Sequence, residues 1–533
     1  MGEFGSFYNV LPDFSENVFS IGYKNTCVTM HKSFLSLLIT VLGAPNFLLI
    51  EVDDLDVGLG STSPLYMPFL SNYIIKEGLT FTSAHVTSPI CCPSRTSMFS
   101  GRYPHNLDDD ASDWCGNFTS QREDTILVGL SEGANYVVAQ HGKWYNQEDT
   151  FCTPGYVPQW KKGPLGEASD LYLLCQEGVY FGNLFNNNGV LERGGPRDYM
   201  TSLLGNRSLD FLRNATVAGS PPWVNYIGFH APHLPATPAP WYAEAPVPSM
   251  APRTPAWNKG WEDKHFVINN GVDKPMSLGL INGSDQLHAQ RLRTLKSVDD
   301  YIRDAVTLLE ASGALDSTYI FFLSDHGYHL GQHGLWCEKA MPYDLDTRIP
   351  FYVKGPGIPP GSTSDALVAM NVDLGPTLLE LAGTPNAWPL NKGIQRDGVS
   401  LTPLLETPSA PHPPGWRTQM LIEFVGWTTP YEWLSPRQFQ LTQSNDTGLI
   451  NGASNRWVAL RTRNATHNSL IADFRPPGSE GKVSTNWTEI YDVNTDLEFI
   501  VNLAVDGRIP QSVIDTMREE LWAVAECRGG SCP

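Results

Sequence analysis

Asn46-Phe47-Leu48-Leu49-Ile50-Glu51-Val52 is a short and almost continuous apolar run, and it leads directly into the acidic pair Asp53-Asp54. Apolar residues at successive positions, rather than at alternating ones, are typical of a strand that is buried on both faces of a parallel sheet. The run therefore predicts a central strand that is covered by helices on both sides and carries two carboxylates at its carboxyl end.

Two similar runs occur later in the chain, at residues 224–229 and 318–323, and they end at His230 and at Asp325-His326. Residues 285–312 and 372–382 have helical periodicity. This alternation predicts an α/β fold with a large, mostly parallel central sheet flanked by helices. Functional residues gather at the carboxyl ends of such strands, so we expect the polar residues after the three strands to meet at one site.

The sequence changes character after residue 405. A proline-rich stretch at residues 407–414 precedes short strand-like runs at 420–424 and 457–460, and residues 513–525 form an amphipathic stretch. We therefore predict a main domain at residues 45–405 and a smaller C-terminal α+β domain at residues 406–533, with a short antiparallel sheet.

Residues 1–44 are interpreted as an N-terminal extension with a signal peptide. Met30-His31-Lys32 precedes an apolar run at residues 34–42, which is too short to span a membrane; a core strand is the alternative. Acceptor sites for N-glycosylation occur at Asn117, Asn206, Asn214, Asn282, Asn445, Asn464 and Asn486. Together these features predict a secreted, secretory-pathway or vacuolar-lysosomal glycoprotein without stable membrane insertion.

The charge balance limits the possible partners. The chain has 36 Lys and Arg residues against 56 Asp and Glu residues, a formal net charge of −20, which argues against binding to nucleic acid. Nine cysteines are present, and Cys527 and Cys532 are close enough in sequence to predict a disulfide, whereas the other pairings stay open. No Cys-x-x-Cys pairs with zinc-ribbon spacing occur, so a structural zinc site is not expected.

The decisive chemical motif is Pro89-Ile90-Cys91-Cys92-Pro93-Ser94-Arg95, and a glycine, Gly101, follows it closely. Taken alone, Cys91-Cys92 would be interpreted as two buried thiols or as a disulfide partner. Pro93 suits the first turn of a helix whose amino end would present free N–H groups to an anion, and Arg95 adds a fixed cation. The full pattern, Cys-x-Pro-Ser-Arg, resembles the signature of the type I sulfatases.

This resemblance implies that a formylglycine-generating enzyme oxidises Cys91 to formylglycine, while Cys92 fills the variable position. Of the two hydroxyl groups of the hydrated aldehyde, one attacks sulfur and the other later expels sulfate. The resemblance also implies a single bound cation, with the ligands Asp53, Asp54, Cys91, Asp325 and His326. Oxygen-dominated ligation favours Ca²⁺, and next to it Mg²⁺, over zinc. Without the resemblance, Asp53-Asp54 would be interpreted as a solvated turn.

Residues that contact the sulfate or the leaving group are also implied by similar local motifs, and these are Arg95, Lys143, His233 and Lys339. His230 is the local alternative to His233. Many arylsulfatases have a histidine shortly after the lysine of Gly142-Lys143-Trp144, whereas this chain has Tyr145-Asn146. We therefore assign no role to Tyr145.

The resemblance covers residues 45–405 and implies an alkaline-phosphatase-like sandwich. It is strongest to fungal-type arylsulfatases and N-acetylglucosamine-6-sulfatases. We therefore expect an arylsulfatase, with a carbohydrate sulfatase such as N-acetylglucosamine-6-sulfatase as the alternative, acting on a small-molecule or glycan sulfate ester. Trp144, Trp160 and Trp223 are candidates for stacking on the leaving group. A phosphoester or phosphonate hydrolase and a non-enzymatic glycan-binding protein are more distant alternatives, and the intact Cys-x-Pro-Ser-Arg motif argues against the binding protein.

Overall fold

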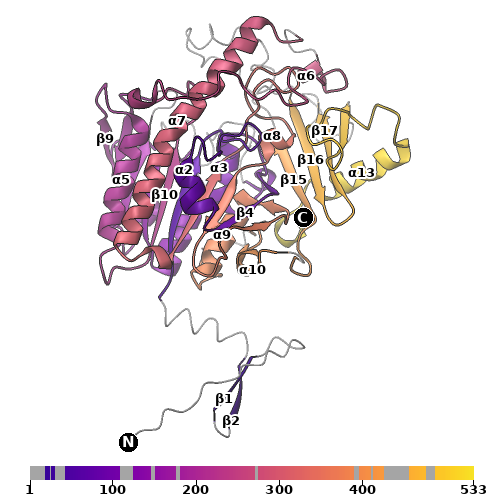
Figure 1. Cartoon of the computed structure of the whole chain (residues 1–533). Coiled ribbons are helices and arrows are strands. Elements are labelled where there is room, and N and C mark those ends of the chain that lie inside the picture. Colours follow the sequence, from indigo (N-terminus) through magenta and orange to yellow (C-terminus); the bar gives the residue numbers. More distant parts are fainter. Residues whose placement is uncertain are drawn as a thin grey trace, which may run out of the picture.

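A ten-stranded mixed sheet forms the centre of the molecule (Figure 1). The computed structural model describes residues 19–23, 26–30, 43–107, 124–145, 151–175, 180–269, 274–388, 395–409, 412–424, 455–475 and 487–533. The strands of the sheet, in spatial order, are β13 (Ser362–Ser364), β4 (Leu79–Phe81), β12 (Phe351–Lys354), β11 (Thr318–Ser324), β3 (Asn46–Val52), β10 (Trp223–Phe229), β6 (Val137–Gly142), β7 (Asp170–Leu174), β8 (Leu184–Asn187) and β9 (Val190–Arg193). The five strands from β11 to β7 run parallel, and antiparallel pairs flank them.

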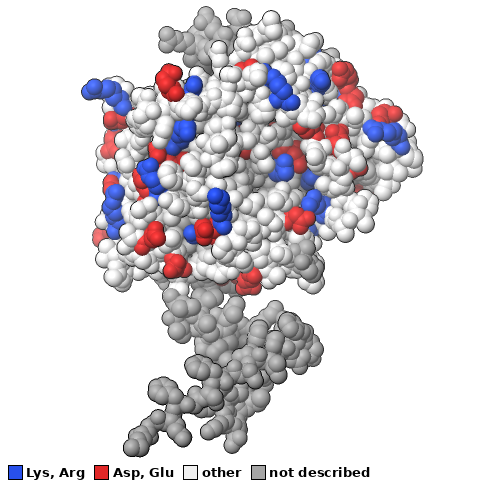
Figure 2. Space-filling view, viewed as in Figure 1, with Lys and Arg blue, Asp and Glu red and all other residues white. Residues whose placement is uncertain are grey.

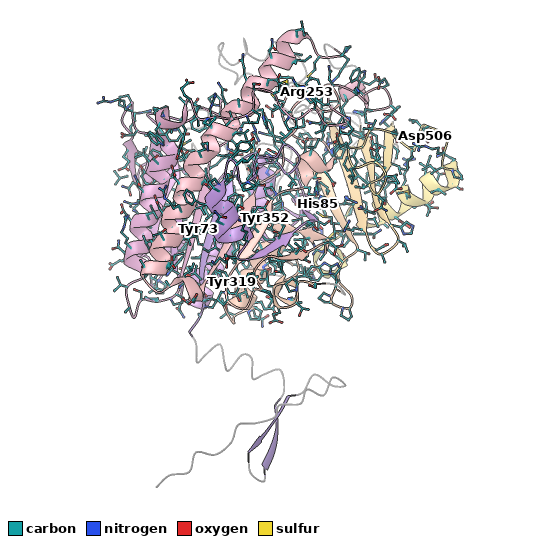
Figure 3. All side chains as sticks on the ribbon, viewed as in Figure 1. Tyr73, His85, Arg253, Tyr319, Tyr352 and Asp506 are labelled. Carbon is teal, nitrogen blue, oxygen red and sulfur yellow. A yellow bond between two sulfur atoms is a disulfide. The ribbon has the colours of Figure 1, made fainter. Side chains whose placement is uncertain are left out.

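The three strands expected from the apolar runs are adjacent in this sheet. β3 lies between β11 and β10 and is parallel to both, with Val52 opposite Ser324 on one side and Phe229 on the other. The predicted α/β fold is therefore confirmed. Figure 3 labels Tyr319, near the start of β11, at the lower edge of the sheet, so the strand runs upward and the residues after it reach the opposite edge.

Helices cover both faces of the sheet. The α-helices of the described residues are α2 (Pro68–Leu70), α3 (Cys91–Ser100), α4 (Ile126–Val128), α5 (Met200–Ala215), α6 (Phe266–Asn269), α7 (Leu278–Ala311), α8 (Asp344–Thr347), α9 (Met370–Leu381), α10 (Thr402–Glu406) and α13 (Gln511–Val524). The predicted helix at residues 285–312 is α7, which starts earlier because the Ser277 side chain caps its first turn by accepting from the Leu280 N–H. The helix predicted at 372–382 is α9.

Successive residues of β3 pack into opposite layers. Phe47 and Leu49 belong to the hydrophobic core shared with α3 and α9, whereas Leu48 and Ile50 belong to the core shared with α5 and α7. All four side chains are almost completely buried. The central strand is therefore covered on both faces, as the uninterrupted apolar pattern predicted.

The C-terminal part of the chain forms a separate four-stranded antiparallel sheet, which confirms that part of the fold prediction. Its strands, in order, are β15 (Gln419–Phe424), β16 (Arg456–Arg463), β17 (Asn468–Arg475) and β18 (Trp487–Asp492). The predicted closing helix is α13, which packs on β17. Two short pairs complete the described strands, β1 (Phe19–Tyr23) with β2 (Thr26–Met30), and β5 (Ala84–His85) with β14 (Val368–Ala369).

The surface of the described residues carries small groups of charges. On the face shown in Figure 2, Lys and Arg alternate with Asp and Glu, and large areas between them are uncharged. Among the described acceptor asparagines, Asn206, Asn214, Asn282 and Asn464 are all exposed, and Asn117, Asn445 and Asn486 lie outside the described residues. None of the described helices combines the length and the apolar character needed to cross a bilayer. Apart from Met30, which ends β2, the predicted signal segment up to residue 42 also lies outside the described residues.

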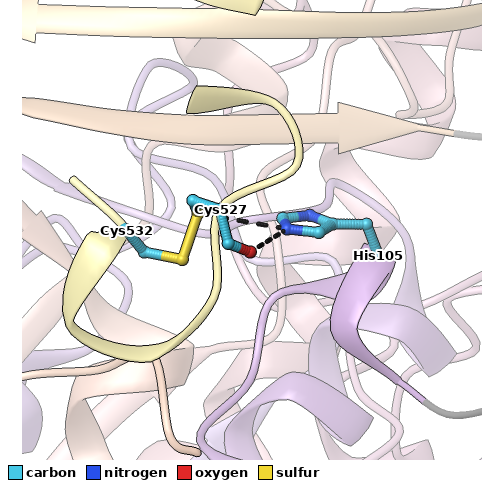
Figure 4. Close-up of side chains that lie close together, drawn as sticks. All are labelled: His105, Cys527 and Cys532. Atoms are coloured by element: carbon cyan, nitrogen blue, oxygen red, sulfur yellow. Dashed lines mark hydrogen bonds between the residues drawn. A yellow bond between two sulfur atoms is a disulfide. The ribbon is translucent and has the colours of Figure 1, made fainter. Parts of the chain in front are cut away.

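A disulfide between Cys527 and Cys532, as predicted, closes a loop at the C-terminus, and a second joins Cys152 to Cys175. The C-terminal loop contacts the segment that follows α3. The His105 ring nitrogen Nε2 lies 2.8 Å from the Cys527 carbonyl oxygen (Figure 4). The other ring nitrogen, Nδ1, lies 2.8 Å from Glu423 Oε1. His105 therefore connects the main domain to both β15 and the C-terminal loop.

We expect the stability of the protein to depend on pH through His105. Burial acts to lower the pKa of His105, but the Glu423 carboxylate and the Cys527 carbonyl together raise it from 6.5 to about 9. A raised folded-state pKa means that this stabilisation is complete below pH 6.5 and is lost as the pH rises to about 9. The free energy of unfolding of His105→Asn, compared with the wild type by urea titration, should show a deficit on the order of 2 kcal/mol at pH 6 that shrinks by pH 9. A deficit independent of pH would contradict the charged pair.

Candidate active site

The acidic pair after β3 is buried and has an unusual backbone conformation. Asp53 and Asp54 are both inaccessible to solvent, and Asp54 has a φ of 60°. The Asp54 N–H donates to Asp325 Oδ1 at 3.2 Å, and its carbonyl oxygen accepts from Arg291 of α7 at 2.6 Å. Because these contacts hold both backbone groups, Asp54 can keep a left-handed conformation that is costly for a residue other than glycine.

Each carboxylate of the pair is matched by one lysine. Lys143 Nζ lies 2.6 Å from Asp53 Oδ2, and Lys339 Nζ lies 2.9 Å from Asp54 Oδ1. Burial acts to raise the pKa of both carboxyl groups, but the lysines, together with nearby histidines, outweigh it and hold both pKa values well below the usual range. Both groups are therefore ionised at neutral pH, as metal binding requires.

Cys91 is the first residue of α3, and its thiol is aimed at this pair. The Sγ atom lies 3.6 Å from Asp53 Oδ1 and 3.3 Å from His326 Nε2. Burial, with help from Asp53 and Asp325, raises the pKa of the Cys91 thiol well above its usual value. The unmodified side chain is therefore a neutral thiol and a poor nucleophile. Its neighbour Cys92 is in a disulfide, whereas Cys91 is free.

Four of the predicted metal ligands gather closely enough to hold one cation. Ligand atoms of Asp53, Asp54, Cys91 and His326 all lie within 4.8 Å of one another. The Asp54 Oδ2 atom is buried and accepts no hydrogen bond. His326 Nδ1 lies 2.9 Å from the Gly327 carbonyl, so in the neutral ring Nδ1 carries the hydrogen and Nε2 presents its lone pair to the cluster. The donor set and the unpartnered carboxylate oxygen fit a divalent cation.

Asp325 borders this cluster but differs from the others in its bonding. Its Oδ2 accepts from Arg95 Nε at 2.9 Å, and its Oδ1 accepts from the backbone N–H groups of Asp54 and His326. Arg95 is completely buried and also binds Glu51 Oε2 at 2.6 Å. In this structure, therefore, Arg95 is part of a network beneath the acidic cluster.

Two histidines from the segment after β10 line the other side of the acidic pair. His233 Nε2 lies 3.9 Å from Asp54 Oδ2, and the side chain is 22% exposed. His230 is buried, its Nδ1 lies 3.7 Å from Asp53 Oδ2, and neither ring nitrogen has a hydrogen-bond partner. Burial, together with His233 and Lys143, lowers the pKa of His230 well below its usual value, so this ring is neutral.

Three residues of this network were not among those predicted from the sequence. Glu51 contacts Arg95 and Tyr226, and burial raises its pKa to about 7 in spite of Arg95. The signal was present, because Glu51 is the one charged residue within an otherwise apolar strand. Tyr226 and Arg291 gave no comparable signal, since a tyrosine in a strand and an arginine on a helix are ordinary.

The prediction that three tryptophans stack on the leaving group is wrong. Trp144, Trp160 and Trp223 are 3%, 1% and 1% exposed, and all three pack into the hydrophobic cores. Trp144 stacks on Tyr145, with a ring-centroid distance of 4.6 Å. Side chains enclosed in this way cannot lie against a substrate, because their aromatic rings already pack against other residues of the hydrophobic cores.

The amino end of α3, a cluster that could hold a cation and two lysines lie close together here. Such an arrangement suits the hydrolysis of an anionic ester. The chain belongs to the sulfatase family, since the model of the Sulfatase family matches residues 45–384. It is thus a sulfuric ester hydrolase.

Relatives match over most of the chain. Human N-acetylglucosamine-6-sulfatase is 34% identical over 505 residues, which cover 92% of this chain and 86% of the relative. The arylsulfatase of Chlamydomonas reinhardtii is 28% identical over 92% of this chain and 75% of its own length. A putative extracellular sulfatase Sulf-1 homologue of Caenorhabditis elegans is 35% identical over 71% of this chain and 52% of its own length.

Solved structures share the fold. A protein in complex with its substrate D-glucosamine-2-N,6-O-disulfate gives a TM-score of 0.66 at 20% identity and covers 90% of this chain and 97% of its own. The phosphonate monoester hydrolase of Agrobacterium radiobacter gives a TM-score of 0.62 at 18% identity, covering 90% and 95%. The predicted alkaline-phosphatase-like sandwich is therefore confirmed.

Proposed function

We propose that the chain hydrolyses aryl sulfate esters to a phenol and sulfate, with formylglycine made from Cys91 as the nucleophile and one Ca²⁺ in the acidic cluster. The position of Cys91 carries this proposal. Its Sγ lies at the amino end of α3, 3.6 Å from Asp53 and 3.3 Å from His326. A buried neutral thiol does not suit this place, whereas the hydrated aldehyde supplies a hydroxyl nucleophile beside a cation.

Asp53, Asp54 and His326 would hold the cation together with residue 91, and Asp325, which borders this cluster, would be the fifth ligand. When bound, Ca²⁺ supplies positive charge that stabilises the sulfate oxygens. The carboxylates are kept ionised without it by Lys143 and Lys339, so the site is ready to accept a hard cation. Arg95 acts from beneath, where it fixes Asp325 through the 2.9 Å bond from Nε.

Lys143 and Lys339 bind the sulfate from two sides in this proposal. Both ammonium groups are buried, and each uses one N–H on a carboxylate of the acidic pair. Their fixed positive charges favour the transition state, in which negative charge builds up around the sulfur, over the singly charged ester, because fixed charges act strongly where water is excluded. Their effect should therefore appear mainly in kcat.

His233 is the residue that we assign to the departing oxygen. It is the partly exposed member of the histidine pair, and its Nε2 faces Asp54 Oδ2 at 3.9 Å. His233 Nδ1 lies 2.8 Å from the Leu234 carbonyl, which fixes the ring orientation. Because phenols leave easily, an aryl ester needs little assistance from an acid at this position.

A 6-O-sulfated amino sugar is the second candidate substrate. It is favoured by the 34% identity to human N-acetylglucosamine-6-sulfatase over 92% of this chain, compared with 28% to the algal arylsulfatase. A sugar alkoxide leaves with more difficulty than a phenolate, so this substrate would depend more strongly on proton donation by His233.

The two candidates can be separated by kcat/KM at equal pH for a nitrophenyl sulfate and for N-acetylglucosamine 6-sulfate. We expect turnover of the aryl ester, with His233→Ala losing about 10-fold on this ester and about 10³-fold on the sugar ester. Turnover of the sugar without any turnover of the aryl ester would reject the arylsulfatase assignment while retaining the sulfatase.

We also propose that the protein matures in the secretory pathway, where a formylglycine-generating enzyme would oxidise Cys91 and glycans would be added. Two structural features support this proposal. The disulfides Cys152–Cys175 and Cys527–Cys532 suit an oxidising compartment, and the four described acceptor asparagines are exposed. Relatives named extracellular sulfatases point the same way.

A further inference from the structure

Lys339 lies on a backbone segment that is strained on both sides. Glu338 has a φ of 127° and Ala340 a φ of 78°, although neither is glycine. Conformations of this kind are costly for residues other than glycine and persist only where surrounding contacts enforce them. The contacts that enforce this segment therefore determine where the Lys339 ammonium group points.

The C-terminal sheet supplies the main contact. The Ala340 carbonyl oxygen accepts from Trp457 Nε1 at 3.0 Å and from Asn455 Nδ2 at 3.0 Å. Trp457 is the second residue of β16, and Asn455 immediately precedes that strand. The Ala340 N–H in turn donates to the carbonyl of Pro89, two residues before Cys91, at 3.2 Å. Ala340 thus joins the C-terminal sheet to the segment that leads into α3.

We propose that Trp457, assisted by Asn455, is a positioning residue for Lys339. The indole N–H holds the Ala340 carbonyl, keeps the segment in its strained conformation, and so directs Lys339 Nζ to within 2.9 Å of Asp54 Oδ1. This inference rests on the proposed function, in which Lys339 binds the sulfate. It gives the C-terminal domain a part in catalysis, although none of its described residues belongs to the acidic cluster.

If Trp457 acted only by packing, a substitution that keeps the packing and removes the hydrogen bond would leave kcat unchanged. The side chain is 3% exposed and packs against Phe424 with a centroid distance of 6.2 Å. Phenylalanine would retain most of this apolar packing but has no N–H to donate. Trp457→Phe therefore separates the hydrogen bond from the packing, and a matched control is available. Trp416 Nε1 donates to the Leu367 carbonyl at 2.9 Å, so Trp416→Phe removes the same kind of bond from the same part of the chain.

The test is a double-mutant cycle with the full-length, matured enzyme and a nitrophenyl sulfate. We expect Trp457→Phe to lower kcat about 10-fold with KM changed less than about 2-fold, and Trp416→Phe to leave kcat unchanged. Lys339→Met should lower kcat about 10³-fold. In the Lys339→Met background, Trp457→Phe should cost nothing further, because the group that it positions is gone.

Each outcome decides a separate point. An unchanged kcat in Trp457→Phe, or the same 10-fold loss in the presence and absence of Lys339, would overturn the positioning role. Wild-type kcat in Lys339→Met would instead contradict the proposed function of that lysine, and the role of Trp457 with it. If Trp457→Phe does not fold, Asn455→Ala removes the second donor to the same carbonyl and enters the same cycle, with the same outcomes required.

Discussion

Cys91→Ala is expected to abolish sulfate ester hydrolysis, with a loss in kcat of at least about 10⁴-fold, while the protein stays folded. The substitution removes the side chain that the proposed mechanism converts into the nucleophile. It leaves Lys143 and Lys339, which pair with the two aspartates, in place. The thiol is small enough that its removal creates little cavity. Cys91→Ser should also be inactive in turnover, since a serine sulfate ester has no second hydroxyl to expel sulfate. Kinetics with a nitrophenyl sulfate measure the loss of turnover, and peptide mass analysis shows the chemical state of residue 91.

Cys92→Ala is the matched control for this prediction. Cys92 is in a disulfide, whereas Cys91 is free and lies 3.6 Å from Asp53. We therefore expect Cys92→Ala to lower the melting temperature but to retain an aldehyde at position 91 and substantial kcat. An inactive Cys92→Ala beside a fully active Cys91→Ala would show that the modified residue has been assigned to the wrong cysteine.

The fold could be predicted where the pattern was local. β3 has the bounds expected from its apolar run, because a strand buried on both faces is mostly apolar until it leaves the sheet. The order of the strands could not be predicted in the same way. β3 lies between β10 and β11, which follow it by about 180 and 270 residues in the chain, and pairing over such distances depends on how the helical layers pack.

The same distinction between local pattern and long-range contact applies to the residues of the site. Asp53, Asp54 and Cys91 could be placed from sequence because each is fixed by a neighbouring strand end or helix start. Arg291, which binds the Asp54 carbonyl, and Trp457, which binds the Ala340 carbonyl, could not be placed. Both are ordinary in their local sequence and acquire a role only through tertiary contacts. The three tryptophans fail for the opposite reason: their aromatic rings suggested stacking on the leaving group, but the fold buries them.

Asp54→Asn is expected to weaken Ca²⁺ binding at least about 100-fold and to lower kcat about 10³-fold. Asp54 has one oxygen bound to Lys339 and a second, Oδ2, that is buried without a donor. An amide in its place removes one negative charge and replaces one potential ligand atom by an NH₂ group, so the cation loses both attraction and coordination. Elemental analysis of the purified protein, together with the rise in melting temperature on adding Ca²⁺, measures the loss. Asp506→Asn changes an exposed carboxylate before α13, at the outer edge of the molecule in Figure 3, and should change neither quantity.

Asp325→Asn is expected to disturb both metal binding and the network below the cluster, and its comparison with Asp54→Asn separates the two effects. Its Oδ2 accepts from Arg95 Nε and its Oδ1 from two backbone N–H groups, so an amide nitrogen at either position would meet donors instead of acceptors. We therefore expect this variant to lose both the cation and activity and, unlike Asp54→Asn, to lose stability even when Ca²⁺ has been removed from both variants by a chelator. The added loss has an electrostatic cause, because Arg95 would keep Glu51 but lose a buried carboxylate partner. Equal melting temperatures of the two chelated variants would contradict this division of roles, and two tightly bound zinc ions in the wild type would favour a phosphatase-like site instead.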